Sequence, residues 1–115
     1  MATTAEVIDR AANDLGLLRL GQTLQSQDNT RISAAYDEVY AMLVNEGLAI
    51  WASTADVPDA LVPHVAALMA DNCINTYGVS KERFQRIKTA SVPAMREIRK
   101  LTAPDFISQD SGAGY

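Results

Sequence analysis

The sequence is poor in the residue types that build chemical sites, and each shortage narrows the possible functions. It has a single cysteine, Cys73, so no disulfide can form within the chain, and we expect a reducing compartment. Its single histidine, His64, has no second metal ligand at a suitable spacing, so we expect no metal site. The first twenty residues carry charges and lack the apolar region of a secretory signal, so we do not expect secretion.

Long apolar runs and catalytic motifs are also missing. No run approaches the roughly 20 apolar residues that a transmembrane helix needs, so we expect no membrane partner. There is no glycine-rich phosphate loop, and no pair of carboxylates is held in a cleft by its spacing. We interpret Cys73, which lies among apolar residues, as a buried thiol, and His64 as a surface or helix-capping residue. The sequence therefore predicts a protein that is not an enzyme and binds no cofactor.

The composition that remains favours helices over sheets. Hydrophobic residues make up 48% of the 115-residue chain but aromatic residues only 6%, so Ala, Leu, Val and Ile must fill the interior of one domain. The stretch from Pro63 to Tyr77 carries one charged residue, Asp71, and is apolar on nearly every side of a helical wheel. A helix that is apolar all round is a buried helix. We therefore predict an all-α fold, a small four-helix bundle around a central helix at about 63–77.

Capping residues and apolar periodicity predict the other helices. Thr3 and Glu6 have the spacing of a capping box and precede an apolar face, and Gly16 is placed to end that helix. A second amphipathic helix is expected over about 26–46, and a last one over about 81–101.

The last predicted helix concentrates the positive charge of an acidic chain. Residues 80–101 hold seven basic and two acidic residues, a charge of +5, whereas the whole chain carries −4, so the remainder carries −9. Such polarity suits head-to-tail stacking or partners of opposite sign on two faces, although solvated faces of arbitrary sign explain it equally well. The apolar phase continues across Pro93, so we expect a bend there and not a break. The cations are Lys81, Arg83, Arg86, Lys88, Arg96, Arg99 and Lys100.

After the bundle domain, residues 1–101, we predict an extended C-terminal arm, residues 102–115. Pro104 stops the last helix, and Ser, Gly and Asp dominate the residues after it. The large side chains of the arm are Phe106, Ile107 and Tyr115. One interpretation is that they anchor the arm in the groove of a partner, and the other is that the arm packs back on its own subunit.

Three further residues are candidates for contacts between subunits. Trp51 follows the second predicted helix and serves either as a lid on the open end of the bundle or as a subunit contact. Asp71 and Asn72 are polar residues in the most apolar helix, so we expect them to face an interface or to cap a neighbouring loop.

A DNA-binding function is the alternative that the residues themselves suggest. The central helix, the turn at 77–80 and the basic last helix have the order of a helix-turn-helix, in which Lys81, Arg83 and Gln85 would lead the recognition helix. The length and bend of the last helix, and the acidity of the whole chain, argue against this interpretation.

The order of short motifs along residues 4–101 resembles a known family. The motifs are Leu15-Gly16 with Leu17 and Gly21, Asn45-Glu46-Gly47-Leu48, Val57-Pro58-Asp59 and Tyr77-Gly78. As an ordered set, they are similar to the head-to-tail adaptor (connector) proteins of tailed bacteriophages. Members of that family are helical and form a ring, usually dodecameric, directly beneath the portal.

The resemblance implies a structural role in the virion neck, with the protein made in the cytoplasm of the bacterial host. Such a ring binds the portal protein, extends the channel through which packaged DNA passes without specific binding, and docks the next neck or tail protein. A C-terminal arm often reaches into the portal. Here the resemblance assigns that contact to the arm, with Pro104, Phe106, Ile107 and Tyr115 as its residues.

Overall fold

A computed structural model describes residues 2–17, 24–52 and 55–102, and within them the protein is all-α. The elements in chain order are α1 (Thr4–Leu15), α2 (Ser26–Asn45), the short 3-10 helix η1 (Asp59–Leu61), α3 (Val62–Tyr77), α4 (Lys81–Ser91) and α5 (Ala94–Thr102). No strand occurs in the described residues, where Ala2 and Val57 form a single antiparallel bridge. The predicted all-α class is confirmed.

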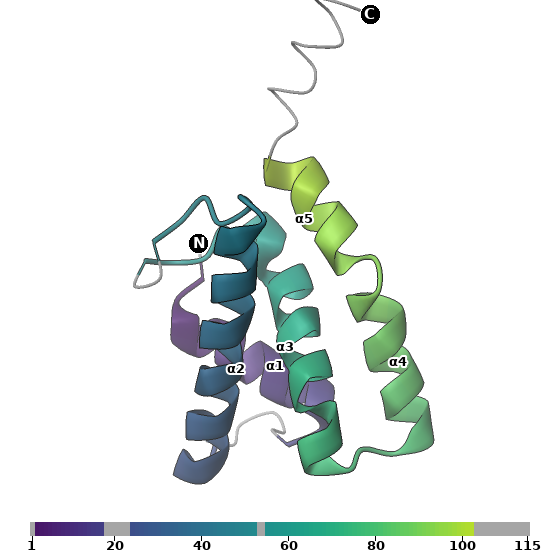
Figure 1. Ribbon diagram of the computed structural model, residues 1–115. Helices are drawn as coiled ribbons and strands as arrows, with labels where there is room; N and C mark the ends of the chain where they lie inside the picture. The colour runs from purple at the N-terminus through teal and green to yellow at the C-terminus, as the bar shows by residue number, and fades with distance from the viewer. Residues whose placement is uncertain (1, 18–23, 53–54, 103–115) are drawn as a thin grey trace, which may run out of the picture.

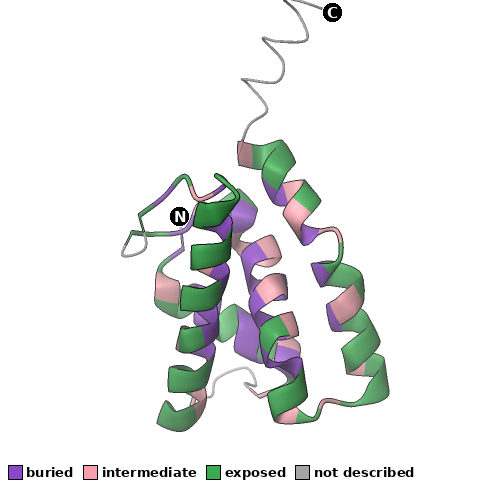
Figure 2. Ribbon diagram, viewed as in Figure 1, coloured by how far each residue is buried: buried purple, intermediate pink, exposed green. Residues whose placement is uncertain are grey.

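Helix α3 is the centre of the fold, as its apolar sequence predicts. It contacts α1, α2, α4, α5 and η1, with α2 on one side, α4 and α5 on the other, and α1 crossing behind (Figure 1). Seven of its residues are buried, whereas Asn72, Asn75 and Thr76 near its C-terminal end are exposed, as are the outer faces of α2 and α4 (Figure 2). Pro63 lies in its first turn, where a proline removes no intrahelical hydrogen bond.

Helix α1 begins and ends at the residues that its sequence predicts. The Thr3 hydroxyl accepts a hydrogen bond from the Glu6 amide at 3.2 Å, and the Glu6 carboxylate accepts one from the Thr3 amide at 3.5 Å. Gly16 follows with φ of 82°, a left-handed conformation that glycine adopts without strain. These local contacts mark the limits of α1.

The predicted last helix is wrong in one respect, because it is two helices. The amide-less Pro93 cannot donate to the carbonyl four residues earlier, and Val92 and Pro93 separate α4 from α5. Each part has its own contact with the core, through Ile87 in α4 and Ile98 in α5. The expected bend is therefore a break, after which α5 continues in a new direction (Figure 1).

Candidate interaction surfaces

The seven cations of α4 and α5 do not form one uniform basic face. Four of them contact polar groups of the same subunit. Lys81, Arg86 and Arg96 are exposed, and none of the three forms an ion pair with a carboxylate in the described part of the chain. These three side chains are therefore the ones left to meet a partner.

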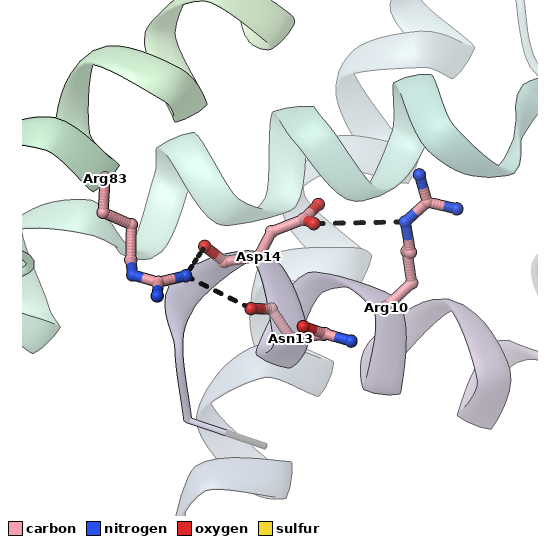
Figure 3. A network of polar contacts seen from close by, with 4 residues as sticks. All are labelled: Arg10, Asn13, Asp14 and Arg83. Atoms are coloured by element: carbon pink, nitrogen blue, oxygen red, sulfur yellow. Dashed lines mark hydrogen bonds and ion pairs between the residues drawn. The ribbon is translucent and has the colours of Figure 1, made fainter. Parts of the chain in front are cut away.

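Arg83 holds the end of α1 against the start of α4 (Figure 3). Its Nη1 donates to the backbone carbonyl oxygens of Asp14 at 3.1 Å and Asn13 at 3.5 Å. The last carbonyls of a helix lack intrahelical partners and carry the negative end of the helix dipole, so a guanidinium stabilises them by both its hydrogen bonds and its charge. Arg83 therefore acts as a cap for a helix that lies far from it in sequence.

Gly16 makes room for this contact. A Cβ atom at Gly16 would lie 2.9 Å from both Cζ and Nε of Arg83, closer than side-chain carbons approach their neighbours. The glycine thus has two roles, because it also adopts a positive φ. Sequence reasoning identified the helix-ending role and missed the second, since nothing near Gly16 in the sequence indicates that Arg83 will lie beside it.

Asp14 belongs to the same network, and the pKa of its carboxyl group is shifted. Burial raises the pKa of Asp14 above its ordinary value, and the charges of Arg10 and Arg83 partly offset that rise. Arg10 Nε lies 4.0 Å from Asp14 Oδ1 (Figure 3). An acidic group at the C-terminal end of a helix is also unfavourably placed in the helix dipole. The ionised carboxylate is therefore less favourable in the folded state than in the unfolded state.

Asp71 and Asn72 have partners within the subunit. Lys88 Nζ of α4 lies 2.7 Å from Asp71 Oδ1, and Asn72 Nδ2 donates to Glu38 Oε2 of α2 at 2.8 Å. The two residues therefore connect α3 to the helix on either side of it. A subunit contact at these positions stays a prediction.

Trp51 is buried in its own subunit, with 7% of its surface exposed. Its indole Nε1 donates to the Tyr36 hydroxyl at 2.9 Å, and its backbone carbonyl accepts from the Tyr40 hydroxyl at 2.5 Å. The Tyr40 ring meets the Trp51 ring edge-on at 5.8 Å between centroids. This is the position of a lid over the core, and it leaves little of the indole for a neighbouring subunit.

The remaining cations of α5 form exposed ion pairs. Arg99 Nη2 lies 3.6 Å from Glu46 Oε2, beyond the end of α2, and Lys100 Nζ lies 3.5 Å from Glu97 Oε1 on its own helix. Exposed pairs of this kind contribute roughly 0–1 kcal/mol to stability. They reduce the net charge that α5 presents without fixing the helix strongly.

Among the residues that the structure describes, the exposed large apolar side chains fall into two sets. One set lies on α4, on α5 and between them, and includes Val92, which is 79% exposed. The other lies at the end of α2 and just after it. The first set is Phe84, Val92 and Leu101, and the second is Met42, Val44 and Ile50.

A groove of about 900 Å³ lies between α1, α3 and α4, and we call it the α1–α3–α4 groove. Small residues of α3 and α4, with Ile87, give it an apolar lining, and Pro63 and Pro93 contribute as well. Its polar residues include three arginines and one aspartate, a charge of +2 with a neutral His64. These polar residues are Arg10, Asn13, Asp14, His64, Arg83 and Arg86.

A smaller hollow of about 540 Å³ lies between α2 and α3. Arg31, Glu38 and Asn72 line it, and Cys73 contributes to it from α3. Cys73 is 2% exposed, and burial raises its pKa, so the thiol is held in its protonated and less reactive form. This agrees with its interpretation as a buried structural cysteine.

No metal-binding cluster and no helix able to cross a membrane occurs within residues 2–17, 24–52 and 55–102. His64 is half-buried in the first turn of α3 and lines the α1–α3–α4 groove. The arm residues Pro104, Phe106, Ile107 and Tyr115 lie outside the described residues, as do Gly21 and most of the connection between α1 and α2.

The arrangement of α3 and α4 differs from a helix-turn-helix. The two helices contact each other, and α4 runs back along α3 as an antiparallel hairpin (Figure 1). A recognition helix instead crosses its preceding helix at a steep angle. Arg83, one of the three residues expected at the start of the recognition helix, is bound to the end of α1.

No protein-family model, curated protein or solved structure matches the chain.

Proposed function

We propose that the protein is a structural head-to-tail adaptor of a tailed bacteriophage. It assembles as a ring, expected to be dodecameric, beneath the portal in the virion neck, extends the DNA channel and docks the next neck or tail protein. In each subunit, a small helical bundle carries the contacts between subunits. The extended C-terminal arm reaches toward the portal.

One observation supports this proposal most directly: α5 leads straight from the exposed cations into the C-terminal segment. Arg96 lies on α5 with no carboxylate partner in the part of the chain that the structure describes, and the helix ends at Thr102. A cation that folding does not use is available to an acidic partner surface. The exposed Val92, just before α5, and Leu101, on α5, add apolar area of the kind that an interface core needs.

The proposal is tested with purified portal rings of the same phage. The native chain is expected to form a stable complex, visible as a discrete mass increase by mass photometry. A chain ending at Thr102 is expected to lose that complex while its helical circular dichroism remains, because α5 is complete without the arm. Undiminished docking of the shortened chain would refute the role of the arm.

A charge-reversal pair tests the electrostatic part separately. Arg96→Glu is expected to weaken portal binding by at least about tenfold, since it replaces an attraction by a repulsion. Arg31→Glu is the matched control, because Arg31 is an exposed cation of α2 without an ion pair in the described chain. Equal effects of the two variants would show that only net charge matters. A salt-sensitive gel shift with DNA would instead favour the DNA-binding alternative.

A further inference from the structure

We propose that the α1–α3–α4 groove is the docking site for the C-terminal segment of the same subunit, residues 103–115. The proposal concerns the subunit on its own and does not depend on the adaptor function. It rests on three properties of the described residues and the sequence: the charge of the groove, its apolar lining, and the distance from the end of α5.

The charges of groove and segment are complementary. The groove carries +2 with a neutral His64, and Arg86 has no carboxylate partner among the described residues. Residues 103–115 contain Asp105 and Asp110 and no lysine or arginine. Binding the segment would give Arg86 a carboxylate partner that the rest of the described fold does not provide.

The apolar surfaces are complementary as well. Ala67 and Ala70 of α3, with 4% and 0% of their surfaces exposed, and the exposed Ala90 of α4 line a groove whose volume of about 900 Å³ can hold larger side chains. The segment supplies such side chains in Phe106 and Ile107, which are adjacent and lie between the two aspartates. A bulky apolar pair flanked by acids fits a small-residue groove flanked by arginines.

The segment is also long enough and begins in the right place. The nine residues of α5 rise about 14 Å from Ala94 to Thr102, and four extended residues span about the same length. Residues 103–106 can therefore return along α5 and bring Phe106 to the Pro93 end of the groove. Continuing in extended form, the chain covers about 14 Å more by residue 110 and places Asp110 near Arg83 and Arg86.

Nuclear magnetic resonance of the full chain tests the docking. A nitroxide spin label is attached to Ser108→Cys; the native chain, whose Cys73 is buried, serves as the labelling control. The amide signals of Ala67, Ala70 and Ala90 are expected to lose most of their intensity. Those of Asp37 and Ala41, on the outer side of α2, are expected to keep it. Signal loss that is absent, or equal at both sets of amides, would overturn the proposal.

Two variants of the labelled chain separate the causes. Replacing Phe106 and Ile107 by serine is expected to restore the groove signals, because it removes the apolar anchors. Arg86→Glu is expected to restore them largely, whereas Arg96→Glu, an exposed cation outside the groove, is expected to leave them weakened. An equal effect of the two arginine variants would contradict the role of groove charge.

A mixing experiment identifies whose segment is bound. Isotope-labelled protein without nitroxide is combined with nitroxide-labelled protein that carries no isotope. Full groove signals in the mixture support docking within one subunit. Weakened groove signals in the mixture would show that the segment of a second copy occupies the groove, which would overturn the assignment made here.

Discussion

Gly16→Ala is the substitution whose effect the structure specifies most completely. The new methyl group meets two separate obstacles. The backbone has φ of +82°, which strains any residue with a Cβ atom, and the Cβ would lie 2.9 Å from the Arg83 guanidinium. The guanidinium is the far end of a flexible side chain, so it can move aside. When it moves, its hydrogen bonds to the carbonyls of Asp14 and Asn13 are lost.

The two effects have comparable sizes. A left-handed alanine costs about 1 kcal/mol. Loss of the Arg83 contacts to the end of α1 costs about 1 kcal/mol more, at the low end for a charged donor because one of the bonds is solvent-exposed. The free energy of unfolding should therefore fall by about 2 kcal/mol, which lowers the Tm of a domain this size by roughly 8 °C.

Two control variants isolate the contribution of Arg83. Gly78 also has a positive φ, of 57°, but a Cβ there would meet nothing within 4 Å. Gly78→Ala should cost only the backbone strain, about 1 kcal/mol. In an Arg83→Met chain, which lacks the guanidinium, Gly16→Ala should likewise cost about 1 kcal/mol.

Urea denaturation followed by circular dichroism, with the midpoint and slope fitted for each variant, measures these differences. A destabilisation by Gly16→Ala no larger than that by Gly78→Ala would refute a contribution from Arg83. An excess cost of Gly16→Ala that is unchanged in the Arg83→Met chain would refute it as well, because the excess would then have another origin.

Three further predictions concern polar side chains. Burial and the hydrogen bond to Asp28 raise the pKa of Tyr77 to about 12, so the folded state holds this proton more tightly than the unfolded state. The free energy of unfolding should therefore fall as pH rises from about 10 to 12. Tyr77→Phe should make that fall smaller, and it should lower the free energy of unfolding by about 1 kcal/mol at pH 8. Urea titrations at each pH measure both effects. Trp51→Phe removes the donor to the buried Tyr36 hydroxyl, so it should lower the free energy of unfolding by about 1–3 kcal/mol in the same titration. If Trp51→Phe lowers it by as much in a chain that already carries Tyr36→Phe, the lost hydrogen bond is not the cause. The raised pKa of Asp14 favours its protonated form in the folded state, so native stability decreases as pH rises above the ordinary aspartate value. Thermal melts should show Asp14→Asn gaining stability relative to the native chain between pH 4 and 7, and a relative loss would refute the burial argument.

Residues close together in the sequence determine where the helices begin and end. The capping box of Thr3 and Glu6 and the left-handed Gly16 and Gly78 each act within one turn, so their effect can be read from neighbouring residues. The central position of α3 could also be predicted, because a helix without a polar face must be covered by others. These features account for the correct all-α class.

The break at Pro93 could be located from the sequence but not classified. A proline always removes one backbone hydrogen bond, so some disturbance is certain. Whether the helix bends or divides depends on whether each part finds its own place on the core. Here Ile87 and Ile98 are both buried, which holds the two parts separately.

The candidate surfaces depended most on tertiary structure. Seven cations were visible in the sequence, but the partners of Arg83, Lys88 and Arg99 come from α1, α3 and the residue after α2, at separations that no local pattern reveals. The α1–α3–α4 groove likewise exists only where three helices meet. The sequence by itself determined the helices and the buried centre, because caps and apolar periodicity act over one or two turns. Only the tertiary structure decided which charges remain available and where a groove opens, because both depend on contacts between distant helices.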